Sequence, residues 1–330
     1  MERMPGSDAA SPQVLFELAT AFQRSRALLT AFELDLFTVL NEQALTSAEV
    51  ASAIDADPRA TDRLMNALVA LGLLEKEEGR FANGPLAARH LVRGTPGFMA
   101  GLGHTVNLWQ SWSDLTGAVR RGGAAPRPAI NDRGDEWLRS FIAAMHGRAT
   151  EVAPEVVALS GLEKPSRVLD LGGGSGAFAM AFARAGHTAV VFDLPNVVPL
   201  TRFYVSAGSL AGPVEVVAGD YLADPIGEGY DAVLLSSVIH SHPPEVNRRL
   251  IAKAAAALNP GGRVIVRDFL MDEDRRGPLQ PALFALNMLV GTSSGDTYTE
   301  SEVRGWLLEA GCREVVRRDT ASASLLIGRL

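Results

Sequence analysis

A glycine-rich turn separates a short apolar run from an alanine-rich stretch of helical character. The turn reads Gly-Gly-Gly-Ser-Gly from Gly172 onward. Glycines such as Gly172 and Gly174 let a ligand approach the backbone, and the N-terminus of a following helix offers unpaired N–H groups to an anionic ligand group. The turn also fits a purely structural role, and Gly172-x-Gly174-x-x-Ala177 loosely fits a dinucleotide-binding fingerprint. It therefore indicates a ligand site without defining the ligand.

Acidic residues end the next two apolar runs. Asp193 ends the second run, where a carboxylate can accept hydrogen bonds from both hydroxyls of a ribose. The third run ends in Gly219-Asp220-Tyr221, and an acidic side chain beside an aromatic one suits an adenine amino group and its ring. The alternative at this position is an Asx turn beside a core tyrosine. Three successive strand ends that suit one adenosine favour a nucleoside-containing ligand.

The elements that must position these residues are short β-branched runs that alternate with alanine-rich helical stretches. The runs cover residues 166–171, 188–194, 214–219, 231–236, 263–269 and 324–330. Such alternation predicts an α/β fold with a parallel sheet. Ligands of these sheets bind at the carboxyl ends of the strands, which is where the glycine-rich turn and the acidic residues lie.

The first half of the chain has a helical apolar period, most clearly over residues 15–40. A short helix capped by Thr46 or Ser47, a second helix over residues 59–71 and a hairpin around Glu78-Gly79 follow, which is a winged-helix-like order. Residues 41–93 carry eight acidic and six basic side chains, so the module repels phosphate. The pattern favours helical packing or dimerisation over DNA binding. Residues 120–136, rich in Gly, Pro and charge, predict a loop.

The composition of the 330 residues is that of a globular protein with room for two domains: 47% are hydrophobic and 21% are charged, with a formal net charge of -7. This balance disfavours general nucleic-acid binding. No apolar run is long enough to span a membrane and the start resembles no leader, so we expect a cytoplasmic protein. The single cysteine, Cys312, excludes an internal disulfide.

A family resemblance is carried by VLDLGGGSGAFA, VVFDLPNVV, AGDYL, the H-x-H-P-P-E segment and LNPGGRVIVRDF. Together these motifs resemble the plant-type and bacterial small-molecule O-methyltransferases that use S-adenosylmethionine, and the likeness covers essentially the whole chain. It implies a Rossmann-like class I methyltransferase domain over residues 161–330. It also implies an N-terminal α-helical, winged-helix-like region over residues 1–160, which serves dimerisation and forms a substrate lid. The protein would then be a homodimer.

The resemblance also implies a set of cofactor contacts at the strand ends. They fall on Gly172, Gly174, Asp193, Leu194, Asp220, Tyr221 and Ser236. The two glycines and the first aspartate would hold the methionine and ribose parts of S-adenosylmethionine, with the leucine beside the adenosine. The second aspartate and the tyrosine would hold the adenine. Ser236 stands where many relatives have a lysine near the carboxylate of the cofactor.

The catalytic residues that the resemblance implies follow the fourth and fifth strands. His240 takes the position of the general base in relatives, and an imidazole can accept a phenolic proton near neutral pH. Asp268 falls where relatives carry a Glu that orients this base, although a strand-end salt bridge with Arg267 or Arg275 is the alternative. Ser241 and His242 replace the usual Asp and Trp, and Thr297 replaces a second orienting Glu. No third ligand follows the two histidines, so no metal is expected.

The acceptor site is implied on two further segments. Phe141 and Met145 occupy positions that line the acceptor ring in relatives, and Asn287 and Met288 occupy positions that contact it. The methionines fit an ordinary core equally well. The expected reaction is methyl transfer to a hydroxyl of a small aromatic or polyketide-like metabolite. Methylation at carbon or nitrogen, cofactor binding with non-methylating chemistry, and a winged-helix regulator stay open as alternatives.

Overall fold

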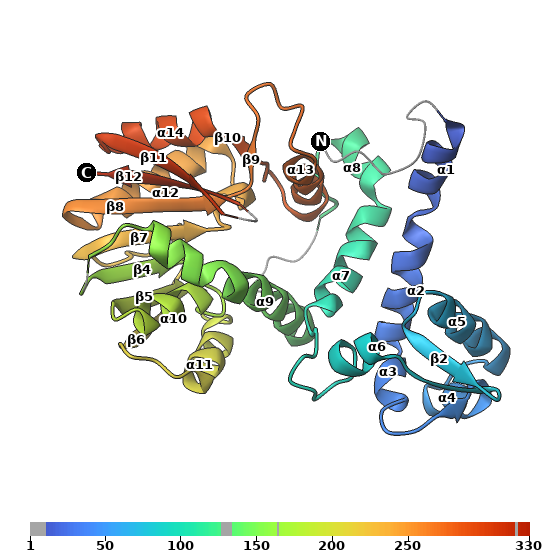
Figure 1. Cartoon of the computed structure of the whole chain (residues 1–330). Coiled ribbons are helices and arrows are strands. Elements are labelled where there is room, and N and C mark those ends of the chain that lie inside the picture. Colours follow the sequence, from blue (N-terminus) through green and yellow to red (C-terminus); the bar gives the residue numbers. More distant parts are fainter. Residues whose placement is uncertain (1–10, 127–133, 164, 321–322) are drawn as a thin grey trace. The chain divides into compact units, whose positions relative to one another are not determined.

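The computed structural model describes residues 11–126, 134–163, 165–320 and 323–330. The chain forms two compact units, Met1–Asn107 and Leu108–Leu330 (Figure 1). This division precedes the functional boundary predicted at residue 160, because helix α9 (Asp135–Leu159) packs on the second unit. Ala153 and Val156 of α9 are buried in the core beneath the large sheet. The functional boundary itself stays a prediction.

The first unit has the helical, winged-helix-like order that the sequence predicts. Its elements are α1 (Pro12–Thr20), α2 (Phe22–Glu33), α3 (Leu36–Val39), β1 (Leu45–Thr46), α4 (Ser47–Ala53), α5 (Pro58–Ala70), β2 (Leu74–Glu77), β3 (Arg80–Asn83) and α6 (Pro85–His90). Thr46 caps α4 in a reciprocal capping box with Glu49, and Asp57 caps α5 by accepting the N–H of Ala60 at 2.8 Å. The predicted cap, second helix and hairpin are therefore confirmed.

The second unit contains one large sheet with helices on both faces. After α7 (Leu102–Ser113), α8 (Leu115–Arg121) and α9, its elements are β4 (Arg167–Leu171), α10 (Ala177–Arg184), β5 (Thr188–Asp193), α11 (Val198–Ala207), β6 (Val214–Ala218), β7 (Tyr230–Ser236), the 3-10 turn η2 (Ile239–Ser241), α12 (Pro244–Ala256), β8 (Leu258–Asp268), β9 (Leu270–Met271), α13 (Leu279–Gly291), β10 (Tyr298–Thr299), α14 (Glu300–Glu309), β11 (Glu314–Asp319) and β12 (Ser324–Arg329). The centre of the predicted loop, residues 127–133, lies outside the described residues. Its ends are helical, in α8 and α9.

The seven strands are ordered β11-β12-β8-β7-β4-β5-β6. The five strands from β8 to β6 are parallel, whereas β12 pairs antiparallel with both β8 and β11. The chain runs from β4 outward to β6 and then returns to place β7 on the other side of β4. In α/β sheets ligands bind at such a switch point, outside the carboxyl ends of the strands. The topology therefore directs attention to the segments that follow β4 and β7.

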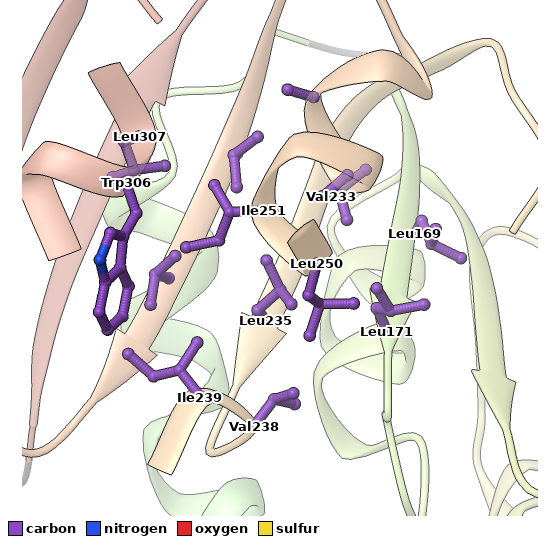
Figure 2. Packing of buried hydrophobic residues seen from close by; sticks show 14 of the residues in the cluster. Leu169, Leu171, Val233, Leu235, Val238, Ile239, Leu250, Ile251, Trp306 and Leu307 are labelled. Atoms are coloured by element: carbon purple, nitrogen blue, oxygen red, sulfur yellow. The ribbon is translucent and has the colours of Figure 1, made fainter. Parts of the chain in front are cut away.

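The core fills both faces of this sheet because strand side chains alternate between them. On one face, Leu169 and Leu235 pack with Leu250 of α12 and Trp306 of α14 (Figure 2). On the other face, Leu234 packs with the residues of α9 and α10, and most of α10 is buried. Strands covered on both sides read as continuous apolar runs, which is why the sequence pattern identified them.

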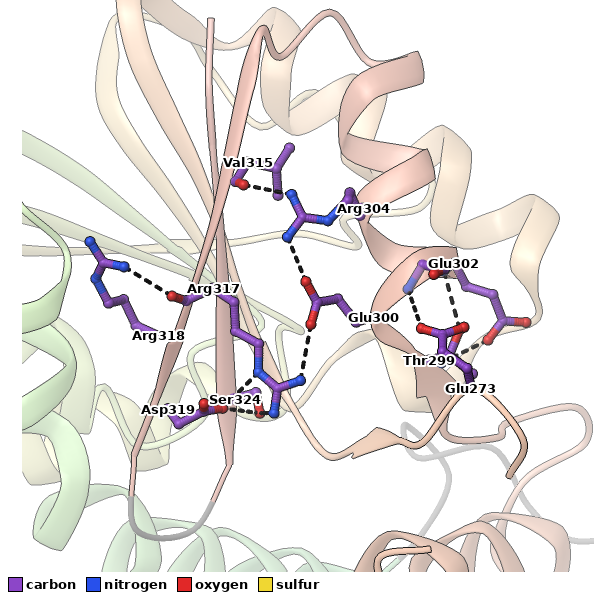
Figure 3. Close-up of polar contacts among 11 residues, drawn as sticks. Glu273, Thr299, Glu300, Glu302, Arg304, Val315, Arg317, Arg318, Asp319 and Ser324 are labelled. Atoms are coloured by element: carbon purple, nitrogen blue, oxygen red, sulfur yellow. Dashed lines mark hydrogen bonds and ion pairs between the residues drawn. The ribbon is translucent and has the colours of Figure 1, made fainter. Parts of the chain in front are cut away.

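The edge strand β11 is held by charged side chains. Arg317 pairs with Glu300 of α14 at 3.0 Å and with Asp319 at 2.9 Å (Figure 3). Ser324 of β12 donates to the same aspartate at 2.7 Å, and Arg304 also pairs with Glu300. Charged side chains on an edge strand discourage pairing with other chains. The network therefore fixes the hairpin and protects the edge of the sheet.

Candidate functional site

The glycine-rich turn after β4 leaves no room for a side chain at Gly173 and disfavours one at Gly172. A Cβ on Gly173 would lie 2.7 Å from the carboxylate of Asp170 and 2.9 Å from Val191. Gly172 has a φ of +71°, a region that L-residues other than glycine seldom adopt. By contrast, a Cβ on Gly174 would approach only Ile142, at 3.7 Å. The turn therefore leaves its backbone open to a ligand and leads directly into the N-terminus of α10.

Asp193, at the end of β5, is joined directly to this turn. Its Oδ2 accepts the N–H of Gly174 at 2.7 Å and its Oδ1 accepts the N–H of Leu194 at 2.7 Å. The side chain is buried, and this burial raises the pKa of Asp193, against the effect of the two N–H groups. Each carboxylate oxygen can accept a further hydrogen bond, so the arrangement is compatible with two ribose hydroxyls.

Asp220 and Tyr221 lie beyond the end of β6. Asp220 forms an Asx turn, since its Oδ1 accepts the N–H of Leu222 at 2.8 Å. The ring of Tyr221 lies beside the glycine-rich turn, because a Cβ on Gly172 would be 3.3 Å from its Cε1 atom. The structure thus brings Gly172, Gly174, Asp193, Leu194 and Tyr221 into one neighbourhood, and the turn alternative at Asp220 uses only one carboxylate oxygen.

Asp170, which the sequence analysis did not single out, lies under the turn. It is 1% exposed, and its Oδ2 accepts the N–H of Ala179 at 3.2 Å. Among the described residues its Oδ1 has no hydrogen-bond partner. Burial raises the pKa of Asp170 to about 7, with a further contribution from the charge of Asp193. The only sequence signal was an acidic residue inside an apolar strand.

Ser236 ends β7 beside a buried cation. The Nη1 atom of Arg267 lies 3.5 Å from its hydroxyl, and the guanidinium of this arginine lies 5.6 Å from the ring centre of Phe178. Burial lowers the pKa of Arg267, whereas the charge of Asp268 opposes this effect. The guanidinium of Arg267 therefore lies beside Ser236, at the position where the family resemblance implies a lysine in many relatives.

His240 and Asp268 form a buried pair. The imidazole Nδ1 lies 2.8 Å from Oδ1 and 3.0 Å from Oδ2 of Asp268, which is 2% exposed. The N–H of Phe269 donates to the same Oδ1 at 2.9 Å, which holds the carboxylate in place. Arg275, a candidate salt-bridge partner of Asp268, pairs instead with Glu302 at 2.9 Å. A carboxylate on Nδ1 keeps a proton there and leaves the lone pair on Nε2.

Phe284 of α13 completes the surroundings of His240 and was not among the predicted site residues. Its ring meets the imidazole edge to face at a centroid distance of 4.8 Å and contacts Phe269 at 4.6 Å. Asn287 lies one turn further along the same helix, and its Oδ1 accepts the indole N–H of Trp112 at 3.0 Å. The family resemblance pointed to Asn287 but not to its partner Trp112, because the two residues belong to distant segments.

The remaining acceptor positions lie on α9 and α13. Phe141 stacks on Trp137 at 5.2 Å and packs in the same small cluster as Leu194, which adjoins Asp193. Met288 of α13 is buried, whereas Met145 of α9 is half-buried. The structure therefore connects Phe141 to the cofactor-side residue Leu194, while Asn287 and Met288 share a helix with Phe284.

Helix α9 also reaches the glycine-rich turn through His146, another residue that sequence reasoning missed. Its Nδ1 lies 2.9 Å from the hydroxyl of Ser175, and its ring stacks on Tyr204 of α11 at 4.0 Å. Burial lowers the pKa of His146, and so does the nearby charge of Arg184. Helix α9, which also carries Phe141, is therefore connected to the glycine-rich turn by a hydrogen bond between two uncharged side chains.

The described part of the chain contains neither a metal-type cluster nor a membrane-type helix. No group of three or more His, Cys, Asp or Glu residues there has the arrangement of a metal site. Within the same residues, no helix combines the length and the apolar character that crossing a membrane requires.

Comparison with known proteins identifies two family matches. Residues 112–313 match the O-methyltransferase domain, and residues 16–93 match the O-methyltransferase dimerisation domain. The first match alone covers more than half of the 330 residues.

Individual relatives agree with these matches over nearly their full length. The 3-hydroxy-5-methyl-1-naphthoate 3-O-methyltransferase of Streptomyces sahachiroi is 35% identical over 92% of this chain and 90% of its own. The tetracenomycin polyketide synthesis 8-O-methyl transferase TcmO of Streptomyces glaucescens is 33% identical over 98% of both chains. The crystal structure of human N-acetylserotonin methyltransferase in complex with SAM superimposes with a TM-score of 0.84 at 28% identity, covering 99% of each chain. The chain therefore belongs to the O-methyltransferase family and is an S-adenosylmethionine-dependent methyltransferase.

Proposed function

We propose that this enzyme methylates a hydroxyl group of a small aromatic or polyketide-like molecule, with His240 as the general base. The observation that carries the proposal is the buried pair of His240 and Asp268 at the switch point of the sheet. It lies next to a turn whose backbone is open to a ligand at Gly174. A proton acceptor and a nucleoside site at one sheet edge are the two parts that the reaction needs.

The cofactor residues that we propose follow β4, β5, β6 and β7. They are Gly172, Gly174, Asp193, Leu194, Asp220, Tyr221 and Ser236. The cradle fits the cofactor because Gly172 and Gly174 carry no side chain and Asp193 already orders the turn. When bound, S-adenosylmethionine supplies a methyl group on a positively charged sulfur, and this carbon passes to the acceptor oxygen as its bond to sulfur breaks.

The proton of the acceptor hydroxyl would pass to Nε2 of His240. Asp268 holds the opposite nitrogen, so the lone pair points away from the carboxylate and the imidazolium that forms is stabilised by a buried negative charge. Phe284 packs against the imidazole in a T-shaped contact, and His240 is 9% exposed. The acceptor oxygen becomes more nucleophilic as its proton leaves, and general-base assistance of this kind contributes about 10²–10⁴-fold.

The hydrogen bond that Trp112 donates to Asn287 indicates which class of methyl acceptor the site would bind. An indole N–H can only donate, so the atom of Asn287 that faces it is the carbonyl oxygen. The amide NH₂ of Asn287 must then point elsewhere, and it can donate to an oxygen of the acceptor. We therefore infer an acceptor that carries a carboxylate or carbonyl oxygen near its reacting hydroxyl. The relatives that act on a hydroxynaphthoate and in tetracenomycin polyketide synthesis support this class.

We also propose a homodimer in which residues 1–160 serve dimerisation and cover the substrate. The match of residues 16–93 to a dimerisation domain supports the first role. The positions of Phe141 and Met145 on α9, before the proposed boundary, support the second. Residues 161–330 would then bind the cofactor and carry out the proton transfer.

The test uses a cofactor labelled with ¹³C in its methyl group. The purified enzyme is incubated with 3-hydroxy-1-naphthoate and, separately, with 2-naphthol, which has the same hydroxyl but no carboxylate. We expect a product whose labelled carbon has the chemical shift of an aryl methyl ether, formed more than tenfold faster from the naphthoate. A labelled carbon bonded to carbon or nitrogen across a panel of phenols and arylamines would contradict O-methylation. Equal rates for the two naphthols would contradict the role of Asn287.

A further inference from the structure

A hydrogen bond joins the segments after β6 and β7. The hydroxyl of Tyr221 lies 2.8 Å from Nε2 of His242, and the two rings meet edge to face at 5.7 Å. In the sheet, β5 and β4 lie between the strands that these segments follow. The bond therefore passes over the carboxyl end of β4, where the glycine-rich turn begins. His242 is half-buried there and takes part in a specific contact.

The backbone at both ends of this bond is fixed. The carbonyl of His242 accepts the side-chain amide of Asn247 at 3.1 Å and also the hydroxyl of Tyr298. Asn247 is fully buried and also holds the carbonyl of Ile239 at 2.8 Å. The carbonyl of Tyr221 accepts the ammonium of Lys253 at 2.8 Å. Because these hydrogen bonds hold both backbones, the rings of Tyr221 and His242 can move only by rotation about their side-chain bonds. The hydrogen bond between the two rings restricts this rotation.

The charges around the two rings favour a bond between neutral groups. Burial raises the pKa of Tyr221, and the negative charges of Asp193 and Asp220 raise it further, so the phenol keeps its proton. Burial lowers the pKa of His242, with His240 adding to this effect and Asp220 opposing it. A protonated phenol can donate to the lone pair of a neutral imidazole.

We propose that His242 is a positioning residue for the cofactor, which holds the ring of Tyr221 against Gly172 as a wall of the adenosine site. The inference rests on the proposed cofactor site. The ring is already in place there, 3.3 Å from where a Cβ of Gly172 would stand. Because the hydroxyl of Tyr221 donates its proton to His242, it has no proton left to donate to the ligand, and the tyrosine contributes mainly its ring surface. Fixing the ring before binding reduces the entropy that binding costs.

The test is a double-mutant cycle read by isothermal titration with S-adenosylhomocysteine, which binds without turnover. We expect Tyr221→Phe and His242→Leu each to raise Kd about three- to tenfold, the range of one hydrogen bond. The Kd of the double variant should be no higher than the higher of the two single-variant Kd values, because both substitutions remove the same hydrogen bond. In steady state, the single variants should raise KM for S-adenosylmethionine and change kcat less than twofold.

Two controls separate this bond from a general loss of stability. Tyr230→Phe removes another hydroxyl, which donates to Ile226 at 3.0 Å from the opposite end of β7, and should leave Kd within twofold of wild type. His242→Gln keeps an acceptor at a similar reach and should restore most of the affinity. If His242→Leu does not fold, Tyr221→Phe and His242→Gln still provide the comparison.

Two outcomes would overturn the proposal: single variants that bind as wild type does, or effects that multiply in the double variant. Failure of the wild-type protein itself to bind S-adenosylhomocysteine would instead contradict the proposed cofactor site. The two failures are therefore distinguishable in one titration series.

Discussion

At the scale of single residues, two buried carboxylates share the base of the proposed cofactor site. Asp193 is held by two backbone N–H groups, whereas Asp170 receives one hydrogen bond and is more completely buried. Two like charges close together in a low-dielectric environment disfavour each other's ionisation. The pKa of Asp170 is raised to about 7 mainly by burial and further by Asp193. Asp170 therefore binds a proton in the folded state at pH values where the unfolded chain does not.

This difference predicts how stability depends on pH. Because the folded-state pKa of Asp170 is above the ordinary value of 3.8, its contribution to stability is lost as pH rises from about 4 to 7. Asp170→Asn removes this titration, so the variant should gain stability relative to wild type between pH 5 and pH 8. The full shift corresponds to about 4 kcal/mol, of which somewhat more than half is gained between pH 5 and pH 8. Urea unfolding at pH 5, 6, 7 and 8 measures it, and a difference that stays constant with pH would contradict it.

The sequence could predict site residues only where a local motif carried them. The spacing of the motifs placed Asp193 at a strand end, and the family resemblance pointed to His240 and Asp268. Trp112 and His146 carried no such signal, because each acts through a partner from a distant segment. Contacts of that kind follow from tertiary packing, which a local pattern does not contain.

At the scale of elements, the turn after β6 depends on a close approach between backbone and ring. A Cβ on Gly219 would lie 2.3 Å from the ring of Phe192 on the neighbouring strand. Phe192 is itself buried in the core, so the ring has little room to move. Gly219 thereby fixes the path of the chain into Asp220 and Tyr221.

Gly219→Ala should therefore displace this segment. We expect the Kd for S-adenosylhomocysteine to rise at least tenfold and the melting temperature to fall by several degrees, because overpacking costs about 1–3 kcal/mol. Gly305→Ala in α14, where a Cβ would meet nothing within 4 Å, is the matched control. Alanine is the better helix former, so this control should keep its affinity and lose no stability. Equal behaviour of the two variants would show that the turn tolerates a side chain.

Buried elements were easier to predict from sequence than exposed ones. The runs that became β4, β5, β7 and β12 are recovered nearly residue for residue, because strands covered on both faces are continuously apolar. The outer strand β6 is recovered as well although none of its residues is fully buried, because three of its five residues are valines. The edge strand β11 was not predicted, since its exposed side chains include Arg317, Arg318 and Asp319 and show no apolar alternation. The helical period over residues 15–40 is real but divided among α1, α2 and α3, with Asp35 in the left-handed region between the last two.

At the scale of the whole molecule, the N-terminal helices display apolar side chains that their own unit does not cover. Leu15, Phe16 and Leu18 of α1 are 70%, 71% and 75% exposed, and Phe22 at the start of α2 is 52% exposed. Contiguous apolar surface of this kind marks interaction sites in proteins. The match of residues 16–93 to a dimerisation domain supports a second copy of the chain as the partner.

Charges on this surface should therefore prevent self-association. We expect wild type to sediment as a dimer, and the double variant Leu15→Glu, Leu18→Glu to sediment as a monomer, because dimerisation would bury both carboxylates without partners. Leu308→Glu, at an exposed apolar residue of α14 outside the matched residues 16–93, should remain dimeric. Analytical ultracentrifugation over a range of concentrations measures the three states. A double variant that remains a dimer would show that α1 lies outside the interface.

The single-turnover rate of methyl transfer to the best hydroxyaryl acceptor tests directly whether His240 is the general base. His240→Gln should slow it by about 10²–10⁴-fold. Asp268→Asn should slow it at least tenfold, because an amide places an NH₂ group next to the imidazole or the N–H of Phe269. Asp231 lies near the start of β7, where its carboxylate accepts the N–H of Arg167 at 2.8 Å. The control variant Asp231→Asn should transfer the methyl group at a rate within twofold of wild type. All three should bind S-adenosylhomocysteine as wild type does, whereas a His240→Gln enzyme with an undiminished rate would contradict His240 as the base.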